Sequence, residues 1–202
     1  MAVNTYDPDI DEFYAKEFQG LELAGQALAG KVFEDCGFTA CDFSEADFSR
    51  ARFIDCHFSK CNLSLVKLGQ TRFNNVHFDA CKLVGVDWTR ASFPQLVLDA
   101  PFAFHQCILN DSSFFGLNLH DLAMEECKAH EVDFREATLA EANFSHTDLS
   151  NSLFVKTDLS GANFEEAENY RIDLFENRLK GARFTRSEAV HLLECLDIEL
   201  VD

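Results

Sequence analysis

Large apolar residues recur at every fifth position over most of this chain. The run of centres extends from Phe18 to Leu98, slips by one residue near 100–102, and continues from Phe104 to Phe184. Counted in this way there are 34 central positions, of which only Ala129 and Asn169 lack a large apolar side chain. Neither an α-helix nor an ordinary strand has a period of five. The chain is therefore an internal repeat whose unit is a five-residue block.

The composition of each block indicates its geometry. A small residue stands two places before most centres, and Ser, Asp, Gly and Lys are common at the two places after it. Residues two apart in an extended chain face the same side, so the small residue and the centre both point inward. The two remaining residues suit a corner. Repeated sides and corners predict an all-β solenoid whose coils stack at about 4.8 Å. The spacing alone leaves open how many blocks make one coil.

The repeat divides the chain into three parts. Residues 16–186 form the predicted solenoid, with the register break near 100–102, between an N-terminal segment 1–15 and a C-terminal element 187–202. The first segment is acidic and lacks the period of five. A calcium-binding EF-hand loop counted from Asp7 would need Gly at position 12 and Glu at position 18, where the chain has Glu12 and Phe18. We expect a mobile or capping segment instead.

The C-terminal element has the pattern of a short helix followed by a short strand. Thr185 or Ser187 can cap the helix, and Glu188 favours its positive N-terminal end. Such an element could simply cover the end of the solenoid. An open coil end also exposes strand edges that favour pairing, so we prefer a two-fold dimer. The apolar residues expected at this interface are Leu192, Leu193, Leu196, Ile198 and Leu200.

The cysteines and histidines do not indicate catalytic or metal chemistry. Seven of the eight cysteines occupy the small inward position, where Cys alternates with Ala, Val, Thr and Ser: Cys36, Cys41, Cys56, Cys61, Cys81, Cys107 and Cys127. Spacings in multiples of about five are not those of zinc or redox sites. A filled interior also offers no dry pocket for a general acid and base. We therefore predict a protein that is not an enzyme and that holds no metal or cofactor.

The net charge restricts the partners. The sequence has 17 Lys and Arg against 35 Asp and Glu, a formal charge of -18, and residues 1–103 carry -6 of it (9 bases, 15 acids) while residues 104–202 carry -12 (8 bases, 20 acids). Such a surface repels nucleic acid and anionic membranes and attracts cationic partners. With no apolar run long enough for a membrane helix and no signal-peptide pattern, we expect a cytoplasmic protein.

Several blocks match the consensus of a known repeat. ADFSR (46–50), ANFSH (142–146), TDLSN (147–151) and TDLSG (157–161) resemble the pentapeptide-repeat family, over residues 16–186 in all. The resemblance implies a right-handed quadrilateral β-helix with four blocks in each coil. It would give about 8.5 coils and a rod roughly 40 Å long.

Within that family, the break at 100–102, the segment 107–119 and the ending from 169 onward resemble the gyrase-protecting subgroup. They are most similar to the albicidin-resistance protein and more distantly to the quinolone-resistance proteins. This resemblance implies a dimeric DNA mimic that binds DNA gyrase, with topoisomerase IV as a further target, and protects it from a topoisomerase poison. No insertion longer than one residue is apparent in the sequence, which favours an albicidin-like poison over a quinolone.

Twenty residues in each coil would bring particular carboxylates together. The predicted gyrase-facing residues are Asp121, Glu125, Glu126, Glu141, Asp158, Glu165 and Glu166. The alternative is a pentapeptide-repeat scaffold or regulatory protein with no topoisomerase partner.

Overall fold

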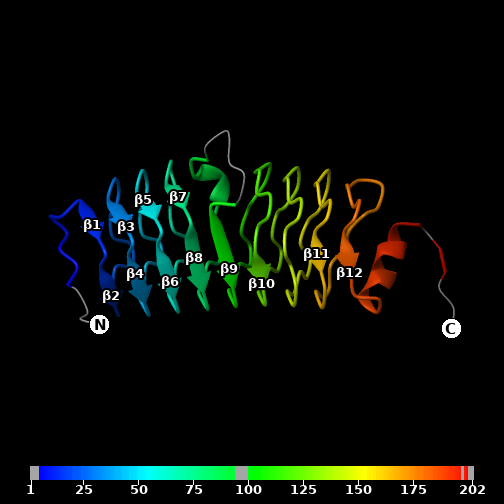
Figure 1. Cartoon of the computed structure of the whole chain (residues 1–202), viewed down its shortest axis with the longest axis horizontal. Helices are drawn as coiled ribbons and strands as arrows, with labels where there is room; N and C mark the ends of the chain where they lie inside the picture. Colours follow the sequence, from blue (N-terminus) through cyan, green and yellow to red (C-terminus); the bar gives the residue numbers. More distant parts are fainter. Residues whose placement is uncertain (1–4, 94–99, 197, 200–202) are drawn as a thin grey trace.

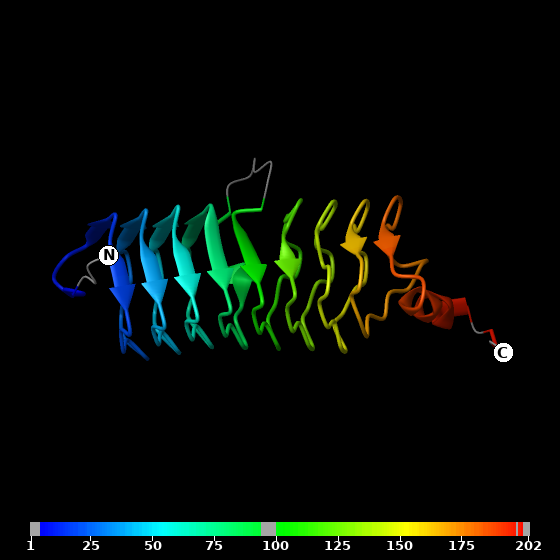
Figure 2. The ribbon, with the colours of Figure 1, turned by 60° about the horizontal axis from the view of Figure 1, so that its bottom comes forward.

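The chain winds into an elongated solenoid whose coils follow one another along a single axis (Figure 1). The computed structural model describes residues 5–93, 100–196 and 198–199. Figure 2 shows the same ribbon turned about that axis, with the strands of successive coils in register and the C-terminal helix across one end. The all-β solenoid that the repeat predicted is confirmed.

The extended sides of the coils are short and pair in parallel. The strands are β1 (Glu12–Tyr14), β2 (Glu17–Gln19), β3 (Val32–Glu34), β4 (Gly37–Thr39), β5 (Arg52–Ile54), β6 (His57–Ser59), β7 (Arg72–Asn74), β8 (Val76–Asp79), β9 (Phe102–His105), β10 (Met124–Glu125), β11 (Asn163–Phe164) and β12 (Arg183–Phe184). They form sheets in the orders β1-β3-β5-β7, β10-β9-β8-β6-β4-β2 and β11-β12. Isolated parallel bridges such as Asp42↔Asn62 and Asp47↔Lys67 pair the other sides.

The register of these pairs gives the size of a coil. Phe13 lies beside Phe33, and Phe38 beside Phe58, so successive coils are offset by 20 residues. Four five-residue blocks therefore complete one turn, which is the quadrilateral arrangement that the family resemblance implied.

One coil is longer than the others. Val76 pairs with Phe102 and Lys82 with Ile108, which is an offset of 26 residues. The Ser92 amide still donates to Thr71, and the Val76 amide donates to Pro101. Six extra residues thus lie between positions 92 and 101, just after the 3₁₀ helix η1 (Trp88–Arg90). The expectation that no insertion exceeds one residue was wrong. The predicted centre Leu98 lies outside the described residues.

Stacked aromatic rings fill the interior. Phe18, Phe38, Phe58, Phe78 and Phe104 form one column, with centroids 4.6 to 5.3 Å apart between neighbours and nearly parallel planes. A second column runs from Trp88 through Phe114, Phe134 and Phe154. Each buried Phe removes its ring from water, worth about 1.5–3 kcal/mol, and stacking adds roughly 0.5–1.5 kcal/mol for a pair. The sequence therefore encodes the same dry core coil after coil.

The corners are made by a left-handed residue at the end of each block. Positive φ angles recur at intervals of five, at Glu45 (58°), Arg50 (61°), Asp55 (50°) and Lys60 (55°) for example, and 23 of the described residues with a positive φ are not glycine. A left-handed residue redirects the chain after each three-residue side. The two-residue corner predicted from the sequence is confirmed.

The N-terminal end of the rod is covered by its own chain. The Tyr6 ring packs 5.6 Å from Phe13 and 6.4 Å from Phe18. Lys31, only 6% exposed, donates to the carbonyls of Pro8 (2.8 Å) and Ile10 (2.6 Å). The segment before the repeat is thus a cap. Within that segment, β1 already pairs in parallel with β3.

The C-terminal end departs from the repeat by one residue before it stops. Asn169 is exposed, and Tyr170 takes the inward position, buried to 1% exposure. The 3₁₀ helix η2 (Glu188–Leu196) then crosses the last coil, and Leu192 packs against the core. The predicted helix is present in this form. The short strand expected at Ile198 and Leu200 is not seen at the described residues 198–199, and Leu200 lies outside them.

Candidate acidic interaction surface

The cysteines form a buried ladder along the inside of the rod. The backbone amides of Cys41, Cys61, Cys81 and Cys107 each donate to the sulfur one coil further on, at 3.3 to 3.4 Å. Hydrogen bonding to Cys107, together with burial, raises the pKa of Cys81 to about 12, which keeps the group a neutral thiol. These side chains act as small packing groups that satisfy backbone amides. Among the described residues no three His, Cys, Asp or Glu side chains are grouped so as to hold a metal ion.

Six of the seven predicted carboxylates lie on two edges of the rod. Asp121 and Glu141 occupy equivalent corners of successive coils, and we call this pair the Asp121 edge. The strand positions Ala123, Asn143 and Asn163 lie between it and the next corner. That next corner carries the Glu126 edge, which consists of Glu125, Glu126, Glu165 and Glu166. The twenty-residue coil therefore brings six of the seven predicted residues onto two neighbouring edges.

The two edges differ in how far their charges are neutralised. On the Glu126 edge, Glu126 accepts from the Gln106 amide (2.8 Å) and lies 3.5 Å from His105. The Gln106 hydrogen bond and His105 lower the pKa of Glu126. Glu165 pairs with Arg183 at 3.0 Å, although both side chains are more than half exposed. Exposed pairs of this kind contribute little stability and exchange readily for other partners.

The Asp121 edge is the more available of the two. Asp121 and Glu141 make no ion pair with any described residue, and a hypothetical Cβ on Gly161 would meet the Glu141 carboxylate. The Glu141 side chain therefore lies along the edge above Gly161. No ion pair with a described residue therefore competes with a partner for these two carboxylates on neighbouring coils.

Asp158 belongs to neither edge. It lies on the side of the coil before the Asp121 edge, bridged to Thr138 and Arg178 on the neighbouring coils. Its carboxylate accepts from the Ser160 hydroxyl (2.6 Å) and the Ser160 amide (3.0 Å). Burial alone would raise the pKa of Asp158, but the Ser160 hydrogen bonds outweigh it, so the pKa is lowered. The geometry gives Asp158 a role in shaping the turn.

Further carboxylates occupy the other two edges of the C-terminal coils, and none of them was among the residues predicted from the sequence. Asp111, Glu131 and Glu136 all stand at left-handed corner positions, equivalent to those of Asp121 and Glu141. The signal was present in the sequence, because each is the last residue of its block. The acidic surface therefore surrounds the rod.

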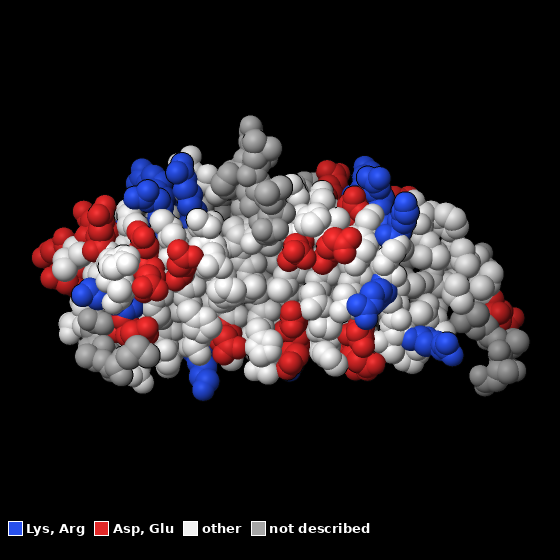
Figure 3. All heavy atoms as spheres, in the orientation of Figure 1, with Lys and Arg blue, Asp and Glu red and all other residues white. Residues whose placement is uncertain are grey.

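Charge density separates the two halves of the solenoid. Residues 104–184 carry 15 acids and 7 bases, a net charge of -8, whereas residues 12–93 carry 11 acids and 9 bases, a net charge of -2. Each stretch makes about four coils, or roughly 19 Å of rod. The C-terminal coils thus hold one net negative charge in about 2.4 Å, against about 1.7 Å for duplex DNA and about 10 Å for the N-terminal coils. Figure 3 shows basic side chains gathered over β5 and β7.

The apolar residues predicted for the dimer interface differ in exposure: some pack against the last coil and others face solvent. Leu192 packs on the core and Leu193 is half-buried, whereas Leu196 (36%) and Ile198 (54%) are exposed. Beside η2 runs a groove of about 550 Å³ whose lining includes Leu153, Val155, Ile172, His191 and Cys195. The tail therefore covers the coil end and still presents apolar surface.

The stacked coils, the five-residue sides and corners and the filled core define a β-solenoid of the pentapeptide type. A family model described as "Pentapeptide repeat region" matches residues 31–100 and 86–164. The chain belongs to the pentapeptide-repeat family. Among curated proteins the search gave no match.

Solved structures are similar to this chain at low sequence identity. A trypsin-treated variant of QnrB1, a plasmid-mediated fluoroquinolone resistance protein, is 22% identical with a TM-score of 0.58, and the match covers 92% of this chain and 100% of that one. HetL, a protein involved in heterocyst differentiation regulation from the cyanobacterium Nostoc, is 18% identical with a TM-score of 0.44 and 88% coverage of each chain. The likeness to QnrB1 shows the fold alone. In the described part of the chain, no helix has the length and apolar character to cross a membrane.

Proposed function

We propose that this pentapeptide-repeat protein is a cytoplasmic, non-enzymatic DNA mimic that binds DNA gyrase. Topoisomerase IV, which handles the same substrate, is the second target we would test. The observation that supports this proposal above others is the net charge of the C-terminal coils, whose density along the rod is within about a factor of 1.5 of that of duplex DNA. Binding would protect the enzyme from a topoisomerase poison such as albicidin or a quinolone.

The physical basis is competition for a cationic groove. A site that holds duplex DNA is lined by Lys and Arg, which attract any rod of similar width and charge. The carboxylates that such a groove would meet first are Asp121 and Glu141, because neither has a cation of its own among the described residues. Affinity of this origin falls steeply as salt increases.

Quinolones have to be considered together with albicidin as the poison, although the sequence alone favoured an albicidin-like compound. Quinolone protection was disfavoured because no insertion longer than one residue was apparent. The coil between β8 and β9 contains six extra residues, so that objection no longer holds. The printed description of QnrB1 as a fluoroquinolone resistance protein adds a reason to test quinolones together with albicidin.

The dimer remains part of the proposal. Leu196 and Ile198 project apolar surface from an end of the rod that η2 already covers. A two-fold contact there would remove this surface from water and join two rods end to end into one about 80 Å long. Such a length would let the acidic coils of both subunits follow one continuous DNA path.

A supercoiling assay tests the function. Purified protein should inhibit supercoiling by gyrase at high concentration, and at lower concentration it should reduce the cleavage complexes that albicidin or a quinolone stabilises. Both effects should weaken as salt is raised. If the protein neither inhibits gyrase nor rescues it from either poison, the scaffold alternative replaces this proposal.

Sedimentation tests the dimer separately. The variant Leu196→Asp/Ile198→Asp should sediment as a folded monomer, because both side chains are exposed in one chain. Leu192→Asp is the matched control, since it should lower the melting temperature by opening the cap. An unchanged mass for the first variant would restrict the tail to capping.

A further inference from the structure

Three arginines with no acidic partner lie together on this acidic protein. Arg50, Arg52 and Arg72, with Gln70 and Ser92, line a pocket of about 390 Å³ on the N-terminal coils. None of the three makes an ion pair with a described residue, and the lining contains no carboxylate. A group of arginines without ion pairs is unexpected in a chain with 35 Asp and Glu, where acidic partners are abundant.

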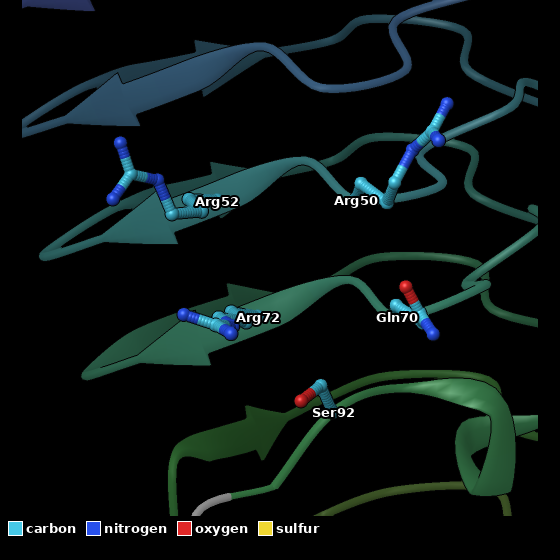
Figure 4. A pocket seen from close by; sticks show the side chains of 5 residues that line it. All are labelled: Arg50, Arg52, Gln70, Arg72 and Ser92. Atoms are coloured by element: carbon cyan, nitrogen blue, oxygen red, sulfur yellow. The ribbon is translucent and has the colours of Figure 1, made fainter.

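The strand register forces two of these charges together. Arg52 in β5 pairs directly with Arg72 in β7, and Figure 4 shows both side chains projecting to the same side of successive strands. Adjacent strands are about 4.8 Å apart, and like charges placed opposite each other destabilise a sheet. An anion between the two guanidinium groups would turn this repulsion into attraction.

The neighbouring corner extends the same pocket. Arg50 and Gln70 occupy equivalent left-handed corners of successive coils, with φ angles of 61° and 60°, and Ser92 lies on the next coil (Figure 4). Asp47, whose carboxylate accepts a hydrogen bond from the Ser49 amide (2.9 Å), interacts electrostatically with Arg50 but forms no ion pair with it. The pocket therefore offers guanidinium, amide and hydroxyl donors from three coils.

We propose that this arginine pocket binds a compact phosphate-class oxyanion, either free or at the end of a small molecule. Guanidinium groups hold phosphate oxygens through paired hydrogen bonds that an ammonium group cannot match. The volume is of the order found for small-molecule sites. A long polyanion such as nucleic acid is disfavoured, because the rest of the surface would repel it. The site is independent of gyrase binding, since it lies on the opposite half of the rod from the acidic edges.

The test uses the full-length protein and sodium pyrophosphate at constant ionic strength. Arginine Nε–Hε signals of Arg52 and Arg72 should shift saturably in NMR spectra, and the melting temperature should rise with pyrophosphate. The double variant Arg52→Gln/Arg72→Gln should bind at least tenfold more weakly. Without anion its melting temperature should equal or exceed that of the wild type, because a like-charge contact has been removed.

Arg135→Gln/Arg178→Gln is the matched control, because it changes the net charge equally at arginines that pair with Asp133 and Asp158. It should bind pyrophosphate like the wild type. A parallel titration with ATP distinguishes the source: tighter binding than pyrophosphate indicates a nucleotide, and weaker binding indicates the free anion. Absence of saturable shifts at millimolar pyrophosphate, or equal affinity in both double variants, would overturn the proposal.

Discussion

The two halves of the rod have the same kind of packed core but differ in surface charge. Stacked aromatic pairs have similar spacing in both halves, 5.3 Å for Phe18 and Phe38 and 5.1 Å for Phe134 and Phe154, yet the net charge is -2 for residues 12–93 and -8 for residues 104–184. The N-terminal coils carry the arginine pocket, whereas the C-terminal coils carry carboxylates on every edge. Because inward positions fix the fold and corner positions do not, the repeat can change its surface without changing its shape. We therefore look for function at the corners.

The largest expected effect tests whether the two interiors are equivalent. Phe38→Ala and Phe134→Ala each remove a fully buried ring stacked between two others, so each should cost about 3–5 kcal/mol of unfolding free energy. Urea unfolding followed by circular dichroism provides the measurement. Phe175→Ala, at a side chain that is 77% exposed, should change little. If the loss of unfolding free energy were much smaller in one half than in the other, the two cores would not be equivalent.

A smaller effect compares two aspartates at equivalent positions of the same side. Burial raises the pKa of Asp148, but hydrogen bonds from Ser150, Asn169 and His130 outweigh it and lower the pKa to about 2. The folded pKa lies below the unfolded one, so this stabilisation is present above about pH 4 and is lost as the pH falls toward 2. Asp148→Asn should cost about 1–2 kcal/mol at pH 7, after allowance for partial exposure.

The same experiment on Asp42 provides the comparison. Its pKa is also lowered, mainly by Ser44, but it has fewer partners than Asp148. Unfolding measured from pH 7 to pH 2 should therefore show a smaller loss for Asp42→Asn. If the Asp148→Asn variant lost stability in acid as steeply as the wild type, the lowered pKa of Asp148 would not be the cause of the acid dependence.

The smallest effect concerns the ends of the two halves, where the repeat is interrupted. Trp88 Nε1 and the Tyr170 hydroxyl are buried and have no hydrogen-bond partner among the described residues. Burial, with a contribution from Glu188, raises the pKa of Tyr170 to about 12. Tyr170→Phe should therefore stabilise the protein by about 1 kcal/mol. Thr157→Val is the contrasting variant, since it removes a 2.9 Å bond to the Phe134 carbonyl and should destabilise.

The features that follow from the period of five could be predicted from the sequence. The length of the insertion could not, because it does not change the period on either side. Inward centres such as Phe38 and Phe134 and the left-handed corners followed directly from the spacing. An insertion of six residues, however, equals one whole block plus one residue, so in the sequence it looks like a slip of one. Only the pairing of Val76 with Phe102 reveals its true length.

The ends and the acidic site were harder to predict for other reasons. A single block around Phe13 is too short to show a period of five. At the other end, Tyr170 takes the inward position where counting in fives predicts Asn169, because the repeat shifts locally by one residue. Among the acids, sequence spacing located the Asp121 and Glu126 edges but could not separate them from Asp158. The Asp158 carboxylate accepts a hydrogen bond from the Ser160 hydroxyl and pairs with Arg178, and these contacts depend on how neighbouring coils stack.

Charge reversal at matched corners tests the central claim most directly. Asp121→Lys/Glu131→Lys/Glu141→Lys and Asp35→Lys/Glu45→Lys/Asp55→Lys change equal charge at equivalent left-handed corners of the two halves. Inhibition of gyrase supercoiling should fall at least tenfold for the first variant and less than about threefold for the second, a difference of more than about 0.7 kcal/mol in binding. Equal losses in the two folded variants, or no loss in the first, would contradict the account.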